Sequence, residues 1–382
     1  MTHAQRRAGA LAAGLLLGLW PLLPFRADAD VSREQQLYEA CVRNDLMAAK
    51  SLLRDGANPN TYTEKGETPF QAAVVNGNRE LVEALLDAGV YLNSPLRNGY
   101  YGLQYAILYS NQGLNRLAGA LAGRNPLGGA HEAIVRLLLD RGADPNGAPP
   151  GTSPPLMLAA LAGNSTVVEL LLDRGADPEV IAPDGTTSLH VAAALGHPQV
   201  VRLLLQRRVR VQAMTDQGAT PLQLAAACGD PALVRLGDAE EALLSEKVAG
   251  AARGRGHADI CQALLARGAN PNAGDFKGET PLMIAAAAGD TQILLDLLTW
   301  GARIEARDGE GATALMHAAA RGKTEAVRFL LGRKADPRAV NRNRETALAL
   351  ARRGGHAQAA ALLERAAGPL EPPKRPLPRF PG

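Results

Sequence analysis

Residues 278–302 have the sequence GETPLMIAAAAGDTQILLDLLTWGA, and this stretch decides the fold. Thr280 before Pro281 is typical of a helix N-cap followed by the first helical position. The apolar run after it predicts a short helix, and Gly289-Asp290 predicts a turn that leads to a second apolar helix. The second helix should end at Gly301, because glycine suits the left-handed C-terminal cap. The stretch therefore predicts a pair of short helices.

The same pattern recurs along the chain. Copies of the opening glycine lie 33 residues apart in three pairs: Gly66 and Gly99, Gly185 and Gly218, and Gly278 and Gly311. After each second helix comes Ala-Asp/Asn-Pro-Asn/Glu or a variant of it, and proline cannot continue a helix, so we expect an extended turn or hairpin there. A single unit of this size cannot bury its apolar face alone. The repeat therefore predicts a stack of units.

In residue type, order and spacing, these units resemble the ankyrin repeat over residues ~33–368, in about nine copies. The resemblance implies an all-α repeat solenoid, an ankyrin-like stack of helix pairs with hairpin fingers between neighbours. It also implies that the chain binds a partner through its finger tips and through the concave face formed by the first helices. The first unit, which lacks the Thr-Pro start, and the last unit, from Arg344, are expected to cap the stack.

The first 29 residues have the pattern of a cleavable signal peptide. Arg6-Arg7 precede an apolar run from Ala8 to Leu23, and Ala27-Asp28-Ala29 offers a cleavage site. The run is shorter than the ~20 residues that a membrane span needs, so we expect no span after cleavage. Arginine outnumbers lysine 34 to 7, which is typical of a GC-rich bacterial genome. We expect an exported bacterial protein, periplasmic or secreted.

The mature domain is expected to cover residues 30–368, with insertions near 111–130 and 230–256. Both insertions fall at the turn between the two helices of a unit. Insertions in solenoids often carry binding, and the alternative is a tolerated surface loop. Residues 369–382 are rich in proline and are expected to form a disordered tail.

Composition and motifs argue against several kinds of site. Of the net charge of +3, residues 1–29 contribute +2, and a near-neutral remainder argues against a nucleic-acid partner. The histidines occupy repeat positions almost throughout, and no H-E-x-x-H or C-x-x-C pattern occurs, so we expect no metal and no cofactor. No nucleophile elbow or other catalytic motif is found, so we expect no enzyme.

Cys228 and Cys261 flank the second insertion. In an oxidising compartment they could form a disulfide that pins the base of the insertion. Two separate buried thiols are the alternative, because a disulfide needs Cα atoms within about 7 Å.

Two features point to a partner-binding surface. All seven tyrosines lie between residues 38 and 109, and tyrosine is a frequent interface hot spot. The register places Tyr62, Tyr100 and Tyr101 in or beside fingers and Tyr109 at the end of a first helix; the alternative is that the rings fill gaps around the first insertion. An apolar strip on the concave face is also predicted, with close helix packing as the alternative; its candidate contact residues include Val74, Val75, Leu161 and Leu195.

The sequence thus predicts an exported, monomeric protein–protein interaction module whose partner is another protein. A secreted effector that binds a target in another cell is an alternative. An enzyme or metal carrier that uses an insertion is a third class.

Overall fold

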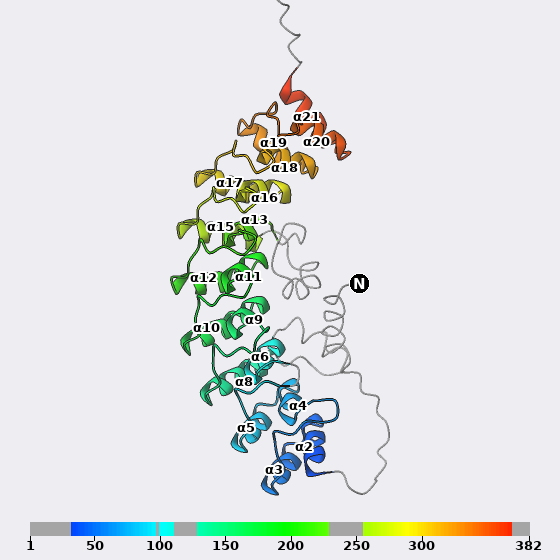
Figure 1. Cartoon of the computed structure of the whole chain (residues 1–382), viewed down its shortest axis with the longest axis vertical. Helices are drawn as coiled ribbons and strands as arrows, with labels where there is room; N and C mark the ends of the chain where they lie inside the picture. The colour runs from blue at the N-terminus through cyan, green and yellow to red at the C-terminus, as the bar shows by residue number, and fades with distance from the viewer. Residues whose placement is uncertain (1–31, 97–98, 111–127, 229–254, 369–382) are drawn as a thin grey trace, which may run out of the picture. The chain divides into compact units, whose positions relative to one another are not determined.

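The computed structural model describes residues 32–96, 99–110, 128–228 and 255–368. Within these ranges the chain forms helices in nine successive pairs and no strand (Figure 1). The predicted leader and tail and nearly all of both insertions lie outside the described residues. The helices are α2 (Arg33–Val42), α3 (Leu46–Arg54), α4 (Pro69–Val75), α5 (Arg79–Asp87), α6 (Gly102–Tyr109), α8 (Gly128–Asp140), α9 (Pro155–Ala162), α10 (Ser165–Asp173), α11 (Ser188–Ala194), α12 (Pro198–Gln206), α13 (Pro221–Ala226), α15 (Arg255–Ala266), α16 (Pro281–Ala288), α17 (Thr291–Thr299), α18 (Ala314–Ala320), α19 (Thr324–Gly332), α20 (Ala347–Arg353) and α21 (Ala357–Ala367).

The first helices begin where the Thr-Pro signal predicts. At α4, the Thr68 hydroxyl accepts from the Gln71 N–H at 3.1 Å, and the Gln71 side-chain oxygen accepts from the Thr68 N–H at 2.9 Å. Thr220 and Gln223 form the same reciprocal pair at α13. Each cap of this kind stabilises its helix by about 1 kcal/mol, because it satisfies backbone donors that the helix cannot.

The C-terminal caps of the second helices are also as predicted. The predicted cap glycines all take the left-handed conformation: Gly142 (φ 90°), Gly175 (φ 86°), Gly268 (φ 85°) and Gly301 (φ 89°). Two of the second helices start earlier than expected. The repeat pattern predicts that His131 and His257 lie in the turn before the second helix, but they lie inside α8 and α15, which begin three and two residues before them.

The chain divides into two compact units. One holds the residues up to Ala192 together with Gln199–Arg210, and the other holds Ala193–Pro198 together with the residues from Val211 onward. In the first unit α2, α4, α6 and α9 pack in succession, and α3, α5, α8 and α10 form a second layer beside them. In the second unit α13, α16, α18 and α20 pack in the same way, and α15, α17, α19 and α21 form the other layer. The chain is therefore an all-α repeat solenoid.

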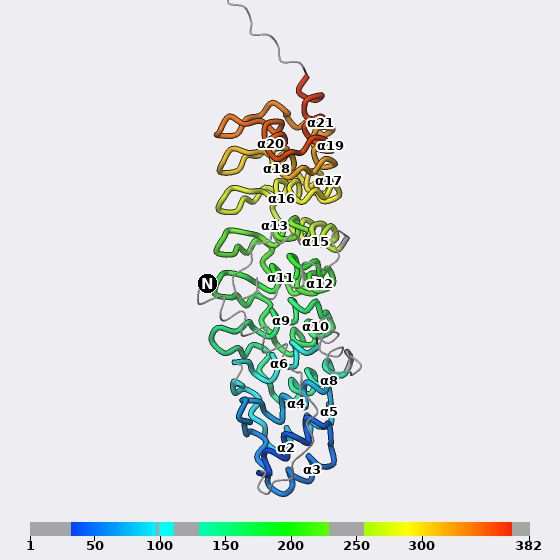
Figure 2. The backbone as a smooth tube through the Cα atoms, turned by 90° about the vertical axis from the view of Figure 1, so that its right-hand side faces the viewer, coloured from blue at the N-terminus to red at the C-terminus, as the bar shows by residue number. Residues whose placement is uncertain are grey.

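A hairpin-like finger precedes the first helices. Before α18, the Asp308 N–H donates to the Ala312 carbonyl at 3.0 Å, and the Gly311 N–H donates to the Asp308 carbonyl at 2.9 Å. A second layer of bonds comes from the side chain at the first finger position, which accepts from the N–H four residues later. These pairs are Thr63 with Glu67, Thr215 with Ala219, Asp275 with Glu279, Asp308 with Ala312 and Asn341 with Glu345. Within each unit the fingers project on one side of the helices (Figure 2).

Asparagine side chains clip successive repeats together. The Asn272 amide donates to the Gly301 carbonyl at 3.0 Å, and its oxygen accepts from the Arg303 N–H at 2.8 Å. Asn60 and Asn146 make equivalent bonds, 29 and 31 residues ahead, in the first unit. Each clip therefore satisfies a helix-end carbonyl of the next repeat and fixes the base of its finger.

Candidate functional site

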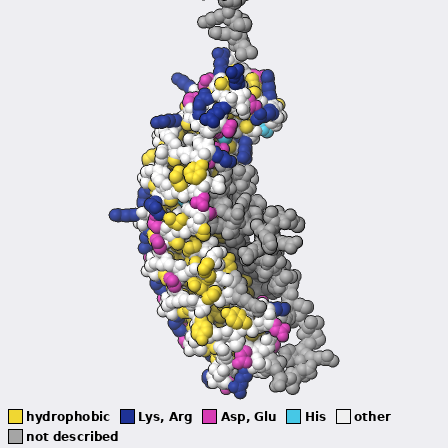
Figure 3. Space-filling model, viewed as in Figure 1, with side chains coloured by type: hydrophobic (Ala, Val, Ile, Leu, Met, Phe, Trp, Pro, Cys, Tyr) yellow, Lys and Arg dark blue, Asp and Glu magenta, His cyan; other side chains and the backbone are white. Residues whose placement is uncertain are grey.

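The fingers carry exposed apolar side chains. In the first unit Tyr62 is 52% exposed and Ile181 is 51% exposed. In the second unit Met214, Phe276 and Val340 are exposed by 47%, 76% and 44%. Figure 3 looks onto the finger tips and shows hydrophobic side chains on this face in each unit. Because water-exposed apolar side chains cost free energy that binding can recover, these positions are candidates for partner contact.

Four of these residues share one repeat position. Each stands four residues before the finger glycine or its equivalent: Tyr62, Ile181, Met214 and Val340. Ile181 pairs through its backbone with Thr187, and Val340 with Thr346. The backbone bonds hold the finger while the side chain stays free to contact solvent. Of these four residues only Tyr62 was predicted from the sequence, because a lone aliphatic residue in a finger gives no aromatic signal.

The other predicted finger tyrosines are less exposed than Tyr62. Tyr100 and Tyr101 are half-buried, and burial raises the pKa of the Tyr100 hydroxyl. Tyr101 is the N-cap residue of α6, and its ring fits against Gly147, where an added methyl group would lie 3.1 Å from the ring. Tyr91 is 69% exposed and was not predicted as a contact. Its backbone N–H donates to the Asn60 side-chain oxygen, so the backbone of this exposed residue is held by one of the asparagine clips.

Tyr109 lies in a cluster of rings. Its ring centroid is 4.9 Å from that of Tyr105 and 6.3 Å from that of His131, and the two hydroxyl oxygens of the tyrosines are 3.5 Å apart. Burial and then the neighbouring Tyr109 raise the pKa of Tyr105. In the same unit the Tyr38 hydroxyl donates to the Glu67 carboxylate. These contacts give the Tyr109 ring a packing role beside α8; the predicted alternative, in which the tyrosine rings fill gaps around the first insertion, involves residues outside the described ranges.

The predicted apolar strip is mostly interior. Val74 is fully buried, and Leu161 and Leu195 are only 4% and 7% exposed. Their side chains serve helix packing, and this corrects their placement on a free concave surface. Val75 is 42% exposed, so its side chain remains a candidate for partner contact.

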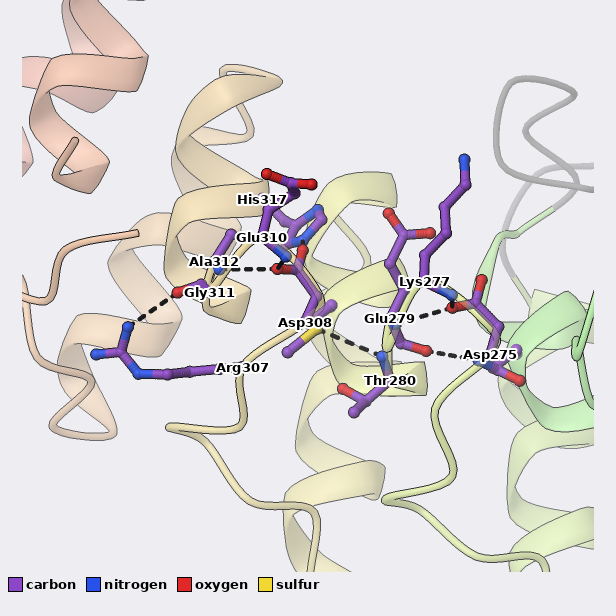
Figure 4. Close-up of polar contacts among 12 residues, drawn as sticks. Asp275, Lys277, Glu279, Thr280, Arg307, Asp308, Glu310, Gly311, Ala312 and His317 are labelled. Carbon is purple, nitrogen blue, oxygen red and sulfur yellow. Dashed lines mark hydrogen bonds and ion pairs between the residues drawn. The ribbon is translucent and has the colours of Figure 1, made fainter. Parts of the chain in front are cut away.

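A polar cluster lies between two fingers and a first helix in the second unit. Glu279 and Asp308 come from successive fingers, and His317 comes from α18 (Figure 4). One ligand atom from each lies within 4.8 Å of the others, and His317 Nε2 is 2.8 Å from Asp308 Oδ2. Burial raises the pKa of Asp308, but the bonds from His317, Ala312 and Glu310 outweigh it and lower the pKa overall.

This cluster was not predicted from the sequence, although one signal was present. His317 lies one residue beyond the histidine slot of the repeat, which His190 occupies in its own unit. His190 Nδ1 lies 2.9 Å from the Thr187 hydroxyl and so serves its helix N-terminus. The displaced His317 instead faces a finger carboxylate.

The cysteines are free thiols in the structure. Cys261 is fully buried, Cys228 is half-buried, and burial followed by the nearby Cys228 raises the pKa of Cys261. The Cys228 thiol also lies 3.7 Å from Asp290 Oδ2. A disulfide between the two cysteines stays a prediction. Among the described residues, no helix has the length and apolarity needed to cross a membrane.

Comparisons with known proteins agree with this architecture. The family described as ankyrin repeats (3 copies) matches residues 37–149, 156–236, 246–308 and 290–369. The chain is 32% identical over 143 residues to human ankyrin repeat and SOCS box protein 16, which is 32% of each protein. It is 38% identical over 118 residues to ankyrin repeat, SAM and basic leucine zipper domain-containing protein 1 of Dasypus novemcinctus, which is 26% of this chain and 25% of that protein.

These matches leave most of each relative uncovered. The chain spans about a third or less of the length of these two relatives. The similarity to these two proteins therefore concerns only the shared repeats. The family match covers most of the chain, and the helix pairs, glycine caps and hydrogen-bonded fingers fit it, so the chain belongs to the ankyrin repeat family.

Proposed function

We propose that this chain is an exported bacterial protein that binds another protein through the apolar side chains of its fingers. Ankyrin repeats indicate a protein–protein interaction module. The finger surface is supported by a contrast in burial: the finger residues Tyr62 and Phe276 are 52% and 76% exposed, whereas Leu161 in α9 and Leu195 directly after α11 are 4% and 7% exposed.

The finger surface suits binding because its backbone is fixed before the partner arrives. The finger turns are held by both backbone and side-chain hydrogen bonds, so the fingers lose little conformational freedom when a partner covers their side chains. Large apolar side chains on a rigid frame are typical of interface hot spots. We propose that the partner offers a complementary apolar protein surface, that the chain is monomeric, and that it binds rather than catalyses.

Site-specific photo-crosslinking tests this surface. A photoreactive residue is placed at Tyr62 or at Phe276 in the full chain, which is expressed in its native host. Controls carry it at Glu169 on α10 or at Glu325 on α19, which are exposed and lie on second helices. The finger positions should yield one discrete adduct that the controls do not. Equal adducts at all four positions, or none at the fingers, would contradict the proposal.

Export is supported by the basic pair Arg6-Arg7, the apolar run after it and the Ala27-Asp28-Ala29 site. Mass spectrometry of the chain recovered from its host should find Asp30 at the N-terminus. An intact leader on protein from the cytoplasmic fraction would contradict export and leave the finger surface unaffected.

A further inference from the structure

We propose that Glu279, Asp308 and His317 form a binding site for one divalent transition-metal ion, and that Zn²⁺ is the ion that this set of donors suits best. The site is independent of the proposed finger surface. It was not expected from the sequence, because its three residues match no known spacing motif and come from three different segments.

The donors have the right chemistry and proximity. One imidazole nitrogen and two carboxylate oxygens lie within 4.8 Å of one another. Zn²⁺ binds such atoms at about 2.0–2.2 Å, so donors of a tetrahedral site lie about 3.5 Å apart. The widest pair of donor atoms therefore needs to close by about 1 Å around the ion, and His317 Nε2 and Asp308 Oδ2, which lie 2.8 Å apart, need to separate by less than about 1 Å. Imidazole together with carboxylate favours zinc over Mg²⁺, which prefers an all-oxygen octahedron.

The Asp308 carboxylate is already oriented. Its Oδ1 accepts from the N–H groups of Glu310 and Ala312 at 2.9 and 2.8 Å, and its Oδ2 faces His317. Hydrogen bonds of this kind fix a ligand so that it loses little freedom when the metal binds. A metal ion between Oδ2 and Nε2 would replace the proton that now joins them.

The histidine has no counterpart in the neighbouring repeats. His317 stands nine residues after the first finger position, Asp308. The residues at the same position in the neighbouring repeats are Leu224, Ile284 and Leu350. Asp275 makes the same finger turn as Asp308, but Ile284 stands where His317 would be. The turn therefore does not require the histidine. His317 adds a nitrogen donor that the neighbouring repeats lack at this position.

The two fingers are locked together, which holds the carboxylates at a constant spacing. The Gly309 N–H donates to the Lys277 carbonyl at 2.7 Å. A methyl group added at Gly278 would lie 2.9 Å from the Gly309 nitrogen, so the backbones touch. The His317 side chain is 20% exposed and the Asp308 side chain 6% exposed. An ion could therefore enter from solvent and keep water at its fourth position.

The test is titration of the full chain, freed of metal with a chelator, with Zn²⁺ alone. Isothermal titration calorimetry and native mass spectrometry should both report one ion per chain. The variants D308N, H317Q and E279Q should each weaken binding at least tenfold, since loss of even an outer-shell partner costs that much. E325Q removes an exposed carboxylate on α19 and should bind as the wild type does.

The variants are chosen to keep the fold. D308N retains the oxygen that accepts from Glu310 and Ala312, and circular dichroism with thermal melting checks each chain. Zn²⁺ should raise the melting temperature of the wild type and of E325Q more than that of the three site variants. Absence of stoichiometric binding by the wild type overturns the site. Equal affinity in the wild type, D308N and E279Q also overturns it, since the ion would then lie elsewhere.

Discussion

His317 Nε2 lies 2.8 Å from Asp308 Oδ2, and this contact joins the first helix α18 to the finger that precedes it. Asp308 has two structural roles, because its other oxygen accepts from two finger N–H groups. Replacement by alanine removes all of these bonds, whereas asparagine keeps the finger acceptor. D308A should therefore lower the free energy of unfolding by about 2 kcal/mol and D308N by less than about 1 kcal/mol, in metal-free buffer. Urea unfolding of both variants measures the difference, and equal losses would show that the turn bonds contribute little.

The asparagine clips predict a second effect on stability. N272A loses the bonds to Gly301 and Arg303 and should cost about 1–2 kcal/mol. E325Q, on the exposed side of α19, should cost no more than about 0.5 kcal/mol. Denaturant unfolding of the two variants gives the comparison. A loss at Asn272 as small as that at Glu325 would mean that water replaces the clip without cost.

Packing of the second helices predicts a larger effect. Leu204 is fully buried in α12 and Leu170 is 6% exposed in α10. Alanine at either position should lower the free energy of unfolding by about 2–5 kcal/mol, because a cavity forms. V75A, at a 42% exposed position, is the matched control and should change stability by less than about 1 kcal/mol. Losses under about 0.5 kcal/mol at both leucines would contradict the repeat register.

His257 predicts a dependence of stability on pH. Burial lowers its pKa below the ordinary 6.5, against the opposing effects of the Ala194 carbonyl and Asp290. Just below pH 6.5 His257 is therefore protonated in the unfolded chain but stays neutral in the folded chain. The free energy of unfolding should fall as the pH falls through 6.5 and towards the lowered pKa.

The variant H257Q separates this effect from other titrations. In H257Q the free energy of unfolding should change less between pH 7.5 and the lowered pKa of His257 than it does in the wild type. Urea unfolding of both chains at matched pH values measures this difference. Parallel curves for the two chains would show that His257 does not cause the loss.

The helix caps and finger turns could be predicted from the sequence because their causes are local. Thr68 and Gly301 act on backbone groups within a few residues, so a short motif is sufficient. The burial of Leu161 and Leu195 depends on how neighbouring helices pack, which no single repeat encodes.

The cluster at His317 could not be predicted from the sequence for the same reason. Glu279 and His317 are 38 residues apart and meet only because successive fingers touch. The one local signal, a histidine displaced by one residue from its slot, does not indicate which carboxylates it faces. The exposed Ile181, Met214 and Val340 were also missed, since exposure of an aliphatic finger residue depends on the backbone bonds that hold the finger.

The affinity of finger variants for the crosslinked partner is the most direct measurement of whether the fingers bind it. Y62A and F276A should each weaken binding by about 2 kcal/mol, or roughly thirtyfold, with the melting temperature nearly unchanged. E169A and E325A on the second helices should bind as the wild type does. Wild-type affinity in both finger variants, together with an unchanged melting temperature, would contradict partner binding through the fingers.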